Sequence, residues 1–338
     1  MNKLIVFSIS LMALTACTKA PQSTGIYLEN LDTTAVAQND FYQYACGGWM
    51  KNNPLPNEYS RFGSFDKLGL SNLEQVNGLI ADIAAKEHKM GSIPQKIGDV
   101  YNLSMDTARR NAEGIAPVLP VLQEIEDVTD KAQWSAVLGK AMDYGLWAMY
   151  VDADAMNSSM NILNEYQAGF ALSQKDYYVD EDEHTKHIRA EYVKHVEKMF
   201  ELYGQANAAE KAATVLRLET RLAKAAFSNV ELRDPIANYN KMSVAELQKL
   251  VPEVDWQVYF AGLNIAPDSL SVGQVRHLQE AGKMLAEESL EDMKTLFTWQ
   301  VIDGSSDFLT EEIFMQNFAF YGRILSGRQE PLHYGNAL

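Results

Sequence analysis

The stretch NDFYQYACGGWMKNNPLPNEYSRFGSFDKL, residues 39–68, is rich in aromatic and turn-forming residues and carries three notable residues close together. Arg61, Gly63 and Asp66 lie in its last third, where the prolines and asparagines predict a loop. Arg61 and Asp66 are five residues apart, and such residues do not share a face of a regular helix. We therefore do not predict a helical ion pair between them, and a surface ion pair of Arg61 elsewhere would contribute only about 0–1 kcal/mol.

Residues 1–17, MNKLIVFSISLMALTAC, are typical of a secretion signal, with Lys3 before an apolar core at residues 4–14. That core is too short to span a bilayer as a helix. Leu-Thr-Ala-Cys resembles the lipobox of bacterial lipoproteins, which makes Cys17 the lipid anchor, and several acyl chains there would hold the protein at a membrane. Thr18 stands where an aspartate would signal retention at the inner membrane, so we expect a bacterial cell-envelope protein at the outer membrane. The alternative is an ordinary signal peptide with an incidental cysteine.

The composition narrows the class of partner and the compartment. A net charge of −16 argues against nucleic acid, whose phosphates require a basic surface. Apolar residues make up 47% of the 338-residue chain, enough for a core beyond a tether at residues 18–38. Cys46 is the second of only two cysteines, so no disulfide is predicted within the lipidated chain, and a small buried thiol is the simplest interpretation.

Most of the remaining chain has helical periodicity. Apolar residues recur every three to four positions in several segments, and two of these begin with a pair that is typical of helix capping boxes. These segments are residues 71–86, residues 192–203 with Gly204 placed to end the helix, residues 215–222, a helix after Ser243 and Glu246, and one after Ser289 and Asp292 whose sequence LEDMKTLFTWQVI predicts burial on much of its surface.

One stretch departs from this pattern. LWAMYVDAD at residues 146–154 and MNILNEYQAGFAL at residues 160–172 are β-prone and flank the turn-forming residues 157–159. The sequence therefore predicts a large, mainly α fold with one small β-hairpin insert.

Two clusters suggest metal ligands. The first consists of three histidines that fall near one face of a helix: His184, His187 and His195. Zinc needs three or four converging ligands. Exposed histidines that follow an acidic helix start are the stronger interpretation. Asp152 and Asp154 suggest calcium, but neither the glycine at the sixth position nor the later bidentate glutamate of a calcium loop follows. We predict no metal site within this chain.

Other catalytic motifs are absent from the 338 residues. No phosphate-binding glycine loop, no nucleophile elbow and no His-Glu-x-x-His zinc helix occurs in the sequence. From the residues alone, the chain would be an acidic helical lipoprotein with no catalytic residue that can be named.

Residues 39–68 closely resemble the N-terminal signature of the neprilysin and endothelin-converting-enzyme family of zinc metallopeptidases. Further segments resemble the family in the correct order: VDADAMNSSMNIL, SQKDYYVD, RDPIANYNKMSVAELQKLVPEVDWQVYF and NFAFYGRILSGRQE. The resemblance covers residues 39–330, which we interpret as an incomplete neprilysin-type N-terminal domain.

The resemblance implies a two-lobed, mostly helical enzyme whose catalytic lobe carries His-Glu-x-x-His, a downstream glutamate and a segment that binds the substrate backbone. In such an enzyme the zinc activates a water and the motif glutamate acts as general base. This chain resembles the first part of the other lobe, which encloses a chamber that admits peptides. We therefore expect the catalytic lobe and its zinc to be missing here and the chain alone to be inactive.

The resemblance also implies a role for two residues. Arg61 and Asp66 match positions that line a substrate subsite in the family, where the arginine pairs with the C-terminal carboxylate of a peptide. Gly63 would permit an unusual backbone conformation nearby. Phe62 and Phe65 are interpreted as packing residues.

The end of the chain differs from the family. Residues 331–338 read PLHYGNAL, where the family continues into another helix, and we interpret them as an aberrant tail from a frameshift, a truncated gene or a fragmentary gene model. Cys46 matches a family cysteine whose usual partner lies in the missing half.

The chain is expected to function as the N-terminal part of a secreted zinc metalloendopeptidase. The alternative is a non-catalytic helical surface lipoprotein that captures peptides or glycans.

Overall fold

A computed structural model describes residues 27–141 and 144–332 of the chain. The contacts divide the chain into two compact units, Met1–Gly69 and Leu70–Leu338, which are described separately below. The predicted signal with Cys17, the first part of the predicted tether and residues 333–338 of the predicted tail lie outside the described residues.

The first unit is built on α2 (Phe41–Asn52), which begins at Asp40, whose side chain accepts a hydrogen bond from the Gln43 N–H. The short helix η1 (Leu28–Asn30) precedes it. The backbone before α2 lies against the helix, because a Cβ on Gly48 would stand 2.3 Å from the Glu29 carbonyl oxygen. Gln43 also donates to Asp32 at 2.8 Å. Residues 29–32, which the sequence places in a tether, are therefore packed against α2.

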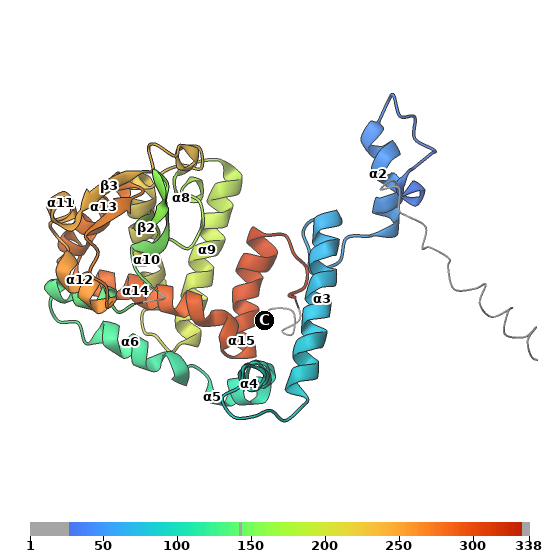
Figure 1. The fold of residues 1–338 in the computed structure, drawn as a ribbon. Helices are drawn as coiled ribbons and strands as arrows, with labels where there is room; N and C mark the ends of the chain where they lie inside the picture. Colours follow the sequence, from blue (N-terminus) through green and yellow to red (C-terminus); the bar gives the residue numbers. More distant parts are fainter. Residues whose placement is uncertain (1–26, 142–143, 333–338) are drawn as a thin grey trace, which may run out of the picture. The chain divides into compact units, whose positions relative to one another are not determined.

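The second unit is mainly helical, as predicted (Figure 1). α3 (Ser64–Ala84) begins in the first unit and continues into the second. The other α-helices of the described residues are α4 (Ile93–Met105), α5 (Thr107–Glu113), α6 (Leu119–Glu126), α7 (Trp134–Leu138), α8 (Asp176–Val179), α9 (Glu183–Leu202), α10 (Ala208–Ala225), α11 (Val244–Leu250), α12 (Trp256–Gly262), α13 (Val275–Glu287), α14 (Leu290–Ser305) and α15 (Glu311–Asn317). Short 3-10 helices are η2 (Ala116–Val118), η3 (Lys131–Gln133), η4 (Glu231–Arg233) and η5 (Ser306–Phe308), and the π-helix η6 (Phe318–Leu325) follows α15.

The predicted helix boundaries are confirmed where a capping signal was present. Ser243 and Glu246 form a capping box at the start of α11. Ser289 accepts a hydrogen bond from the Asp292 N–H at the start of α14. Gly204 follows α9 with φ +68, a conformation that glycine adopts at low cost.

The β-structure is larger than the predicted hairpin. β1 (Trp147–Asp154) and β2 (Asn157–Gln167) pair in antiparallel fashion, but β2 already begins at Asn157, so the prediction of a turn at residues 157–159 is wrong. β4 (Ser269–Val272) adds to β2 in parallel, and β3 (Asn240–Ser243) adds to β4, which gives the strand order β1-β2-β4-β3. The two added strands are too short and too distant in sequence for local patterning to reveal their pairing.

The core of the second unit consists of two apolar clusters, and α14 contributes to both. Leu296 and Phe297 belong to the first cluster, which also contains Trp134 and Trp256. Trp299 belongs to the second cluster, formed chiefly by α9 and α10. The prediction that α14 is buried on much of its surface is confirmed. Figure 1 shows α9 and α10 side by side in this unit, in agreement with their contacts.

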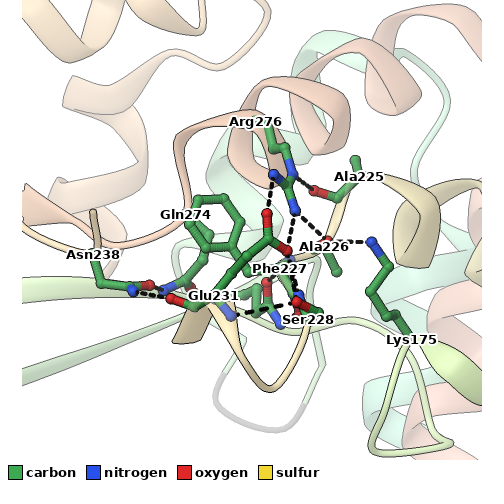
Figure 2. Close-up of polar contacts among 10 residues, drawn as sticks. Lys175, Ala225, Ala226, Phe227, Ser228, Glu231, Asn238, Gln274 and Arg276 are labelled. Carbon is green, nitrogen blue, oxygen red and sulfur yellow. Dashed lines mark hydrogen bonds and ion pairs between the residues drawn. The ribbon is translucent and has the colours of Figure 1, made fainter. Parts of the chain in front are cut away.

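A cluster of polar side chains closes the end of α10 (Figure 2). The Arg276 guanidinium donates to the carbonyl oxygens of Ala225 and Ala226, both at 2.9 Å. It also donates to both carboxylate oxygens of Glu231, at 2.7 and 2.8 Å, and stacks over the Phe227 ring at 4.2 Å. A cation at a helix C-terminus interacts favourably with the helix dipole, so this contact stabilises the end of α10.

The same cluster fixes the loop at residues 226–239. The Gln167 side chain donates to the Phe227 carbonyl and accepts from its N–H. Gln274 accepts from the Gln167 N–H at 2.7 Å and donates to Asn238 at 2.7 Å. Because these side chains come from β2 and from the start of α13, the loop is tied to elements far from it in sequence.

We expect Arg276→Ala to lower the free energy of unfolding by about 1–2 kcal/mol, since the Ala225 carbonyl and Glu231 Oε1 lose their guanidinium donor. The Ala226 carbonyl and Glu231 Oε2 keep donors from Lys175 and Ser228. Arg276→Lys should recover only part of this loss, because one ammonium group cannot reach all three acceptors. Urea denaturation measures the change. Arg109→Ala, which removes an exposed ion pair with Glu113, serves as the control and should leave the midpoint unchanged. Equal effects of Arg109→Ala and Arg276→Ala would contradict the role of this cluster.

Candidate functional site

Asp66 lies in the first turn of α3, at the end of the loop that carries Arg61. Its Oδ2 accepts a hydrogen bond of 2.8 Å from the Gly63 N–H. A carboxylate in the first turn of a helix is favoured by the helix dipole, so Asp66 fixes the backbone that enters α3. Gly63 does not have a positive φ, and a Cβ there would meet only Asp66 Oδ2 at 3.5 Å. The prediction that Gly63 adopts an unusual conformation is therefore wrong.

Arg61 is exposed and forms no ion pair with an acidic residue in the described part of the chain. The neighbouring Phe62 ring packs against Tyr59 at 5.3 Å and Trp49 at 6.2 Å, as predicted. Phe65 is 88% exposed, so the prediction that it packs is wrong for this chain. The loop is thus anchored by Phe62, while the Arg61 guanidinium is left available for a ligand.

Further polar contacts support this loop from α2 and α3. Asn53 donates to the Trp49 carbonyl at 2.8 Å and accepts from Lys67 Nζ at 2.7 Å. These three residues also line a cavity of about 350 Å³ within the first unit. Among the described residues, this loop therefore presents to a carboxylate ligand the Arg61 guanidinium, which is not engaged in an ion pair. Cys46 in α2 is a free, half-buried cysteine.

The structure does not bring the three predicted histidine candidates together on one exposed face. His184 and His187 are exposed on α9, whereas His195 is buried. The His195 ring stacks on Phe320 at 5.0 Å, and burial lowers its pKa to about 3. His195 is a packing residue of the second cluster.

The aspartate pair on β1 is divided between two roles. Asp154 accepts hydrogen bonds from Tyr239 at 2.7 Å and Lys241 at 2.9 Å, and the Lys241 contact is the main reason why its pKa falls to about 2. Asp152 is exposed. Asp154 therefore fastens the hairpin to the residues around β3.

Zinc does not fit the residues that the structure describes. No group of three or more His, Cys, Asp or Glu side chains lies close enough together in the described ranges to hold a metal ion.

Among the described helices, none is long and apolar enough to cross a membrane.

A buried carboxylate that sequence reasoning did not identify lies between four helices. Glu219 of α10 accepts hydrogen bonds from Tyr178 at 2.9 Å, Tyr192 at 2.8 Å and the Ala171 N–H at 3.2 Å. The Tyr192 hydroxyl itself accepts from Trp299 Nε1 at 2.9 Å. Burial raises the pKa of Glu219 to about 8, although the three donors act in the opposite direction. The available sequence signal was a glutamate within the apolar face of residues 215–222.

The comparison with known families now decides the identity of this fold. The profile of the N-terminal domain of peptidase family M13 matches residues 37–335, nearly the whole chain. The chain belongs to peptidase family M13. The resemblance inferred from residues 39–330 is confirmed, and the match extends into the segment that the sequence suggested to be aberrant.

The M13 chain is 24% identical to endothelin-converting enzyme 1 of Mus musculus over 305 residues, which are 85% of this chain and 39% of that protein. It is 28% identical to endothelin-converting enzyme-like 1 of Rattus norvegicus over 244 residues, 68% of this chain and 31% of that protein. The M13 chain thus spans well under half the length of these relatives.

Solved structures of similar proteins share its fold. The inhibitor complex of the zinc metalloprotease Zmp1 of Mycobacterium tuberculosis matches with a TM-score of 0.87 and 29% identity, over 93% of this chain and 49% of that one. PepO from Lactobacillus rhamnosis matches with a TM-score of 0.71 at 20% identity, over 89% of this chain and 48% of that one, which supports the fold alone. The mainly helical lobe is therefore confirmed as an M13 fold.

Proposed function

We propose that this M13 chain is the N-terminal part of a secreted zinc metalloendopeptidase and contributes to the chamber in which peptide substrates bind. Membership of the family and the similarity to Zmp1 support the assignment to a zinc metallopeptidase. The zinc would be held outside the described residues, since these offer no fitting set of ligands. It would supply an activated water and polarise the scissile carbonyl. On this proposal the chain alone does not hydrolyse peptides.

Arg61 is the residue that carries the substrate role in this proposal. Its guanidinium is exposed and lacks an internal carboxylate partner among the described residues. A guanidinium binds a carboxylate with two parallel hydrogen bonds, which a lysine ammonium cannot reproduce. Asp66 acts through the backbone, because its hydrogen bond to the Gly63 N–H sets the loop that presents Arg61. We propose that Arg61 binds the C-terminal carboxylate of a peptide.

The proposed location is the bacterial cell envelope. It rests on the secretion signal at residues 1–17 and on Cys17 as the lipid anchor, with the outer membrane as the membrane partner. Incorporation of a radiolabelled fatty acid into the wild-type protein and not into Cys17→Ser tests the anchor. Equal labelling of both would remove it.

The role of Arg61 predicts a preference for free C-terminal carboxylates. A fluorescein-labelled pentapeptide with a free carboxylate should bind about tenfold more tightly than its C-terminal amide, as expected for a hydrogen-bonded charge pair of about 1.5 kcal/mol. Arg61→Ala should abolish the difference, and Arg61→Lys should keep only part of it. Fluorescence anisotropy with a chelator present measures both affinities.

The matched control is Arg233→Ala, which removes another exposed arginine. It should leave the preference unchanged. Arg61 does not bind the carboxylate if Arg61→Ala weakens the binding of the free-carboxylate peptide and of its amide equally. The same conclusion follows if the wild-type chain binds the two peptides with equal affinity.

A further inference from the structure

β1 is an edge strand whose outer side is unpaired. It stands at one end of the strand order β1-β2-β4-β3 and pairs only with β2. None of the other described residues makes a backbone hydrogen bond to its outer edge. An unpaired edge of this length presents N–H and C=O groups that can pair with another extended chain.

This edge lacks the features that usually prevent such pairing. Residues 147–154 contain no proline, lysine or arginine. Tyr150 is 48% exposed and Val151 is 66% exposed, so apolar side chains stand on both faces of the strand. Asp152 is its one exposed charge, since Asp154 is buried against Tyr239 and Lys241.

A cavity of about 460 Å³ adjoins the start of this strand. Residues 146–149 line it together with residues 168–171, which follow β2, so the cavity lies where β1 begins and β2 ends. Trp299, Gln300 and Asp303 contribute to the remaining wall. The Oδ1 atom of Asp303 is buried and accepts no hydrogen bond from the described residues.

We propose that the free edge of β1 binds an extended peptide segment with alternating apolar and basic side chains by strand addition. The backbone pairing would use the outer N–H and C=O groups of β1. Val151 would contact the apolar side chains on one face of the added strand, and Asp152 would contact the basic side chains on the other. This goes beyond the proposed function, because it requires neither zinc nor Arg61.

Charge selects this occupant over the alternatives. Asp152 on the strand and a net charge of −16 favour a basic segment and disfavour an acidic one. A second copy of the chain is disfavoured in an antiparallel pairing centred on Asp152, because two like charges would then lie opposite each other and destabilise the pair.

The probe is a fluorescein-labelled Lys-Val-Lys-Val-Lys-Val hexapeptide with blocked ends, measured by fluorescence anisotropy in the presence of a chelator. It should bind at least tenfold more tightly than the corresponding Glu-Val-Glu-Val-Glu-Val peptide. Two analogues, each with alternate backbone nitrogens methylated so that the N–H groups of one edge of the peptide are blocked, separate strand addition from simple apolar contact. One of the two should lose at least tenfold in affinity, because only one blocks the pairing edge.

Asp152→Lys should weaken the basic hexapeptide at least tenfold, whereas the matched change Asp82→Lys on the exposed part of α3 should not. Circular dichroism and the unfolding midpoint verify that both variants fold. Arg61→Ala must leave this binding unchanged, which keeps the result distinct from the test of the proposed function.

Equal binding of both methylated analogues, equal binding of the acidic hexapeptide or no effect of Asp152→Lys would each overturn the proposal. So would a dimer in sedimentation analysis that Asp152→Lys disrupts or strengthens while the hexapeptide fails to bind.

Discussion

Glu219→Ala is expected to lower the free energy of unfolding by about 3–5 kcal/mol, because it leaves several buried donors without an acceptor. Tyr178 and Tyr192 each accept an N–H from another residue, so the single proton of each hydroxyl is directed to Glu219. The Ala171 N–H is the third donor to this carboxylate. Removing the carboxylate therefore affects α8, α9, α10 and the segment before α8 at once. Urea denaturation followed by circular dichroism measures the loss.

Milder substitutions at the same cluster should lower the free energy of unfolding by less than Glu219→Ala does. Glu219→Gln keeps one acceptor oxygen and should cost clearly less than Glu219→Ala. Tyr178→Phe leaves the Leu172 N–H without its acceptor and should cost about 1–2 kcal/mol. A loss of under 1 kcal/mol for Glu219→Ala would show that water or rearranged side chains satisfy the three donors, and the carboxylate would then not hold these helices together.

Raising the pH from 6 to 8 is expected to reduce stability, and Glu165 is expected to account for about 2 kcal/mol of the reduction. Glu165 on β2 is buried, and burial raises its pKa from 4.5 to about 8. Its Oε2 accepts only long hydrogen bonds from the N–H groups of Gly273 and Gln274, at 3.2 and 3.4 Å, and its Oε1 has no partner among the described residues. The carboxyl is therefore protonated in the folded chain at pH 6.

The sign follows from proton binding in the two states. Between about pH 5 and 8 the folded state holds a proton on Glu165 that the unfolded state has released, so stability falls as pH rises through this range. His195 and His277 act in the opposite direction, because burial lowers their pKa to about 3 and about 4. Their contribution is lost as pH falls below about 6.5, the pKa of an unfolded histidine.

Glu165→Gln isolates the contribution of this carboxyl. The glutamine keeps an acceptor oxygen for Gly273 and Gln274 and is uncharged at every pH, so the variant should lose about 2 kcal/mol less than the wild type between pH 6 and 8. Denaturant titrations at the two pH values give the difference. Parallel pH profiles for the two proteins would mean that Glu165 is already ionised at pH 6.

The sequence predicted several helices of this fold, because the signals that form a helix are local. The apolar spacing at residues 192–203 corresponds to buried positions of α9, and Ser243 and Ser289 mark helix starts through hydrogen bonds within one turn. The family was also recognisable from the segments between residues 39 and 330, which the profile match confirms.

The candidate site was predictable only in part. Arg61 was identified through the resemblance, but only the structure shows that no described acidic residue pairs with it and that Asp66 caps the loop at Gly63. Phe62 and Phe65 have the same side chain and lie three residues apart, yet among the described residues of the first unit only Phe62 has aromatic neighbours. Which of the two packs depends on Trp49 and Tyr59, and no local pattern reveals that choice.

The sequence by itself determined the helical class, the helix ends that carry a capping signal, the acidic character and the family. The tertiary structure decided that residues 29–32 lie on α2, that β3 and β4 extend the predicted hairpin and that Glu219 joins four helices. It also decided that no other strand of the described residues pairs with the outer edge of β1. The physical reason is the range of the interactions. Helix capping and amphipathic spacing act within a few residues, whereas strand partners and buried polar contacts join residues up to more than 100 positions apart and form only when the whole core closes around them.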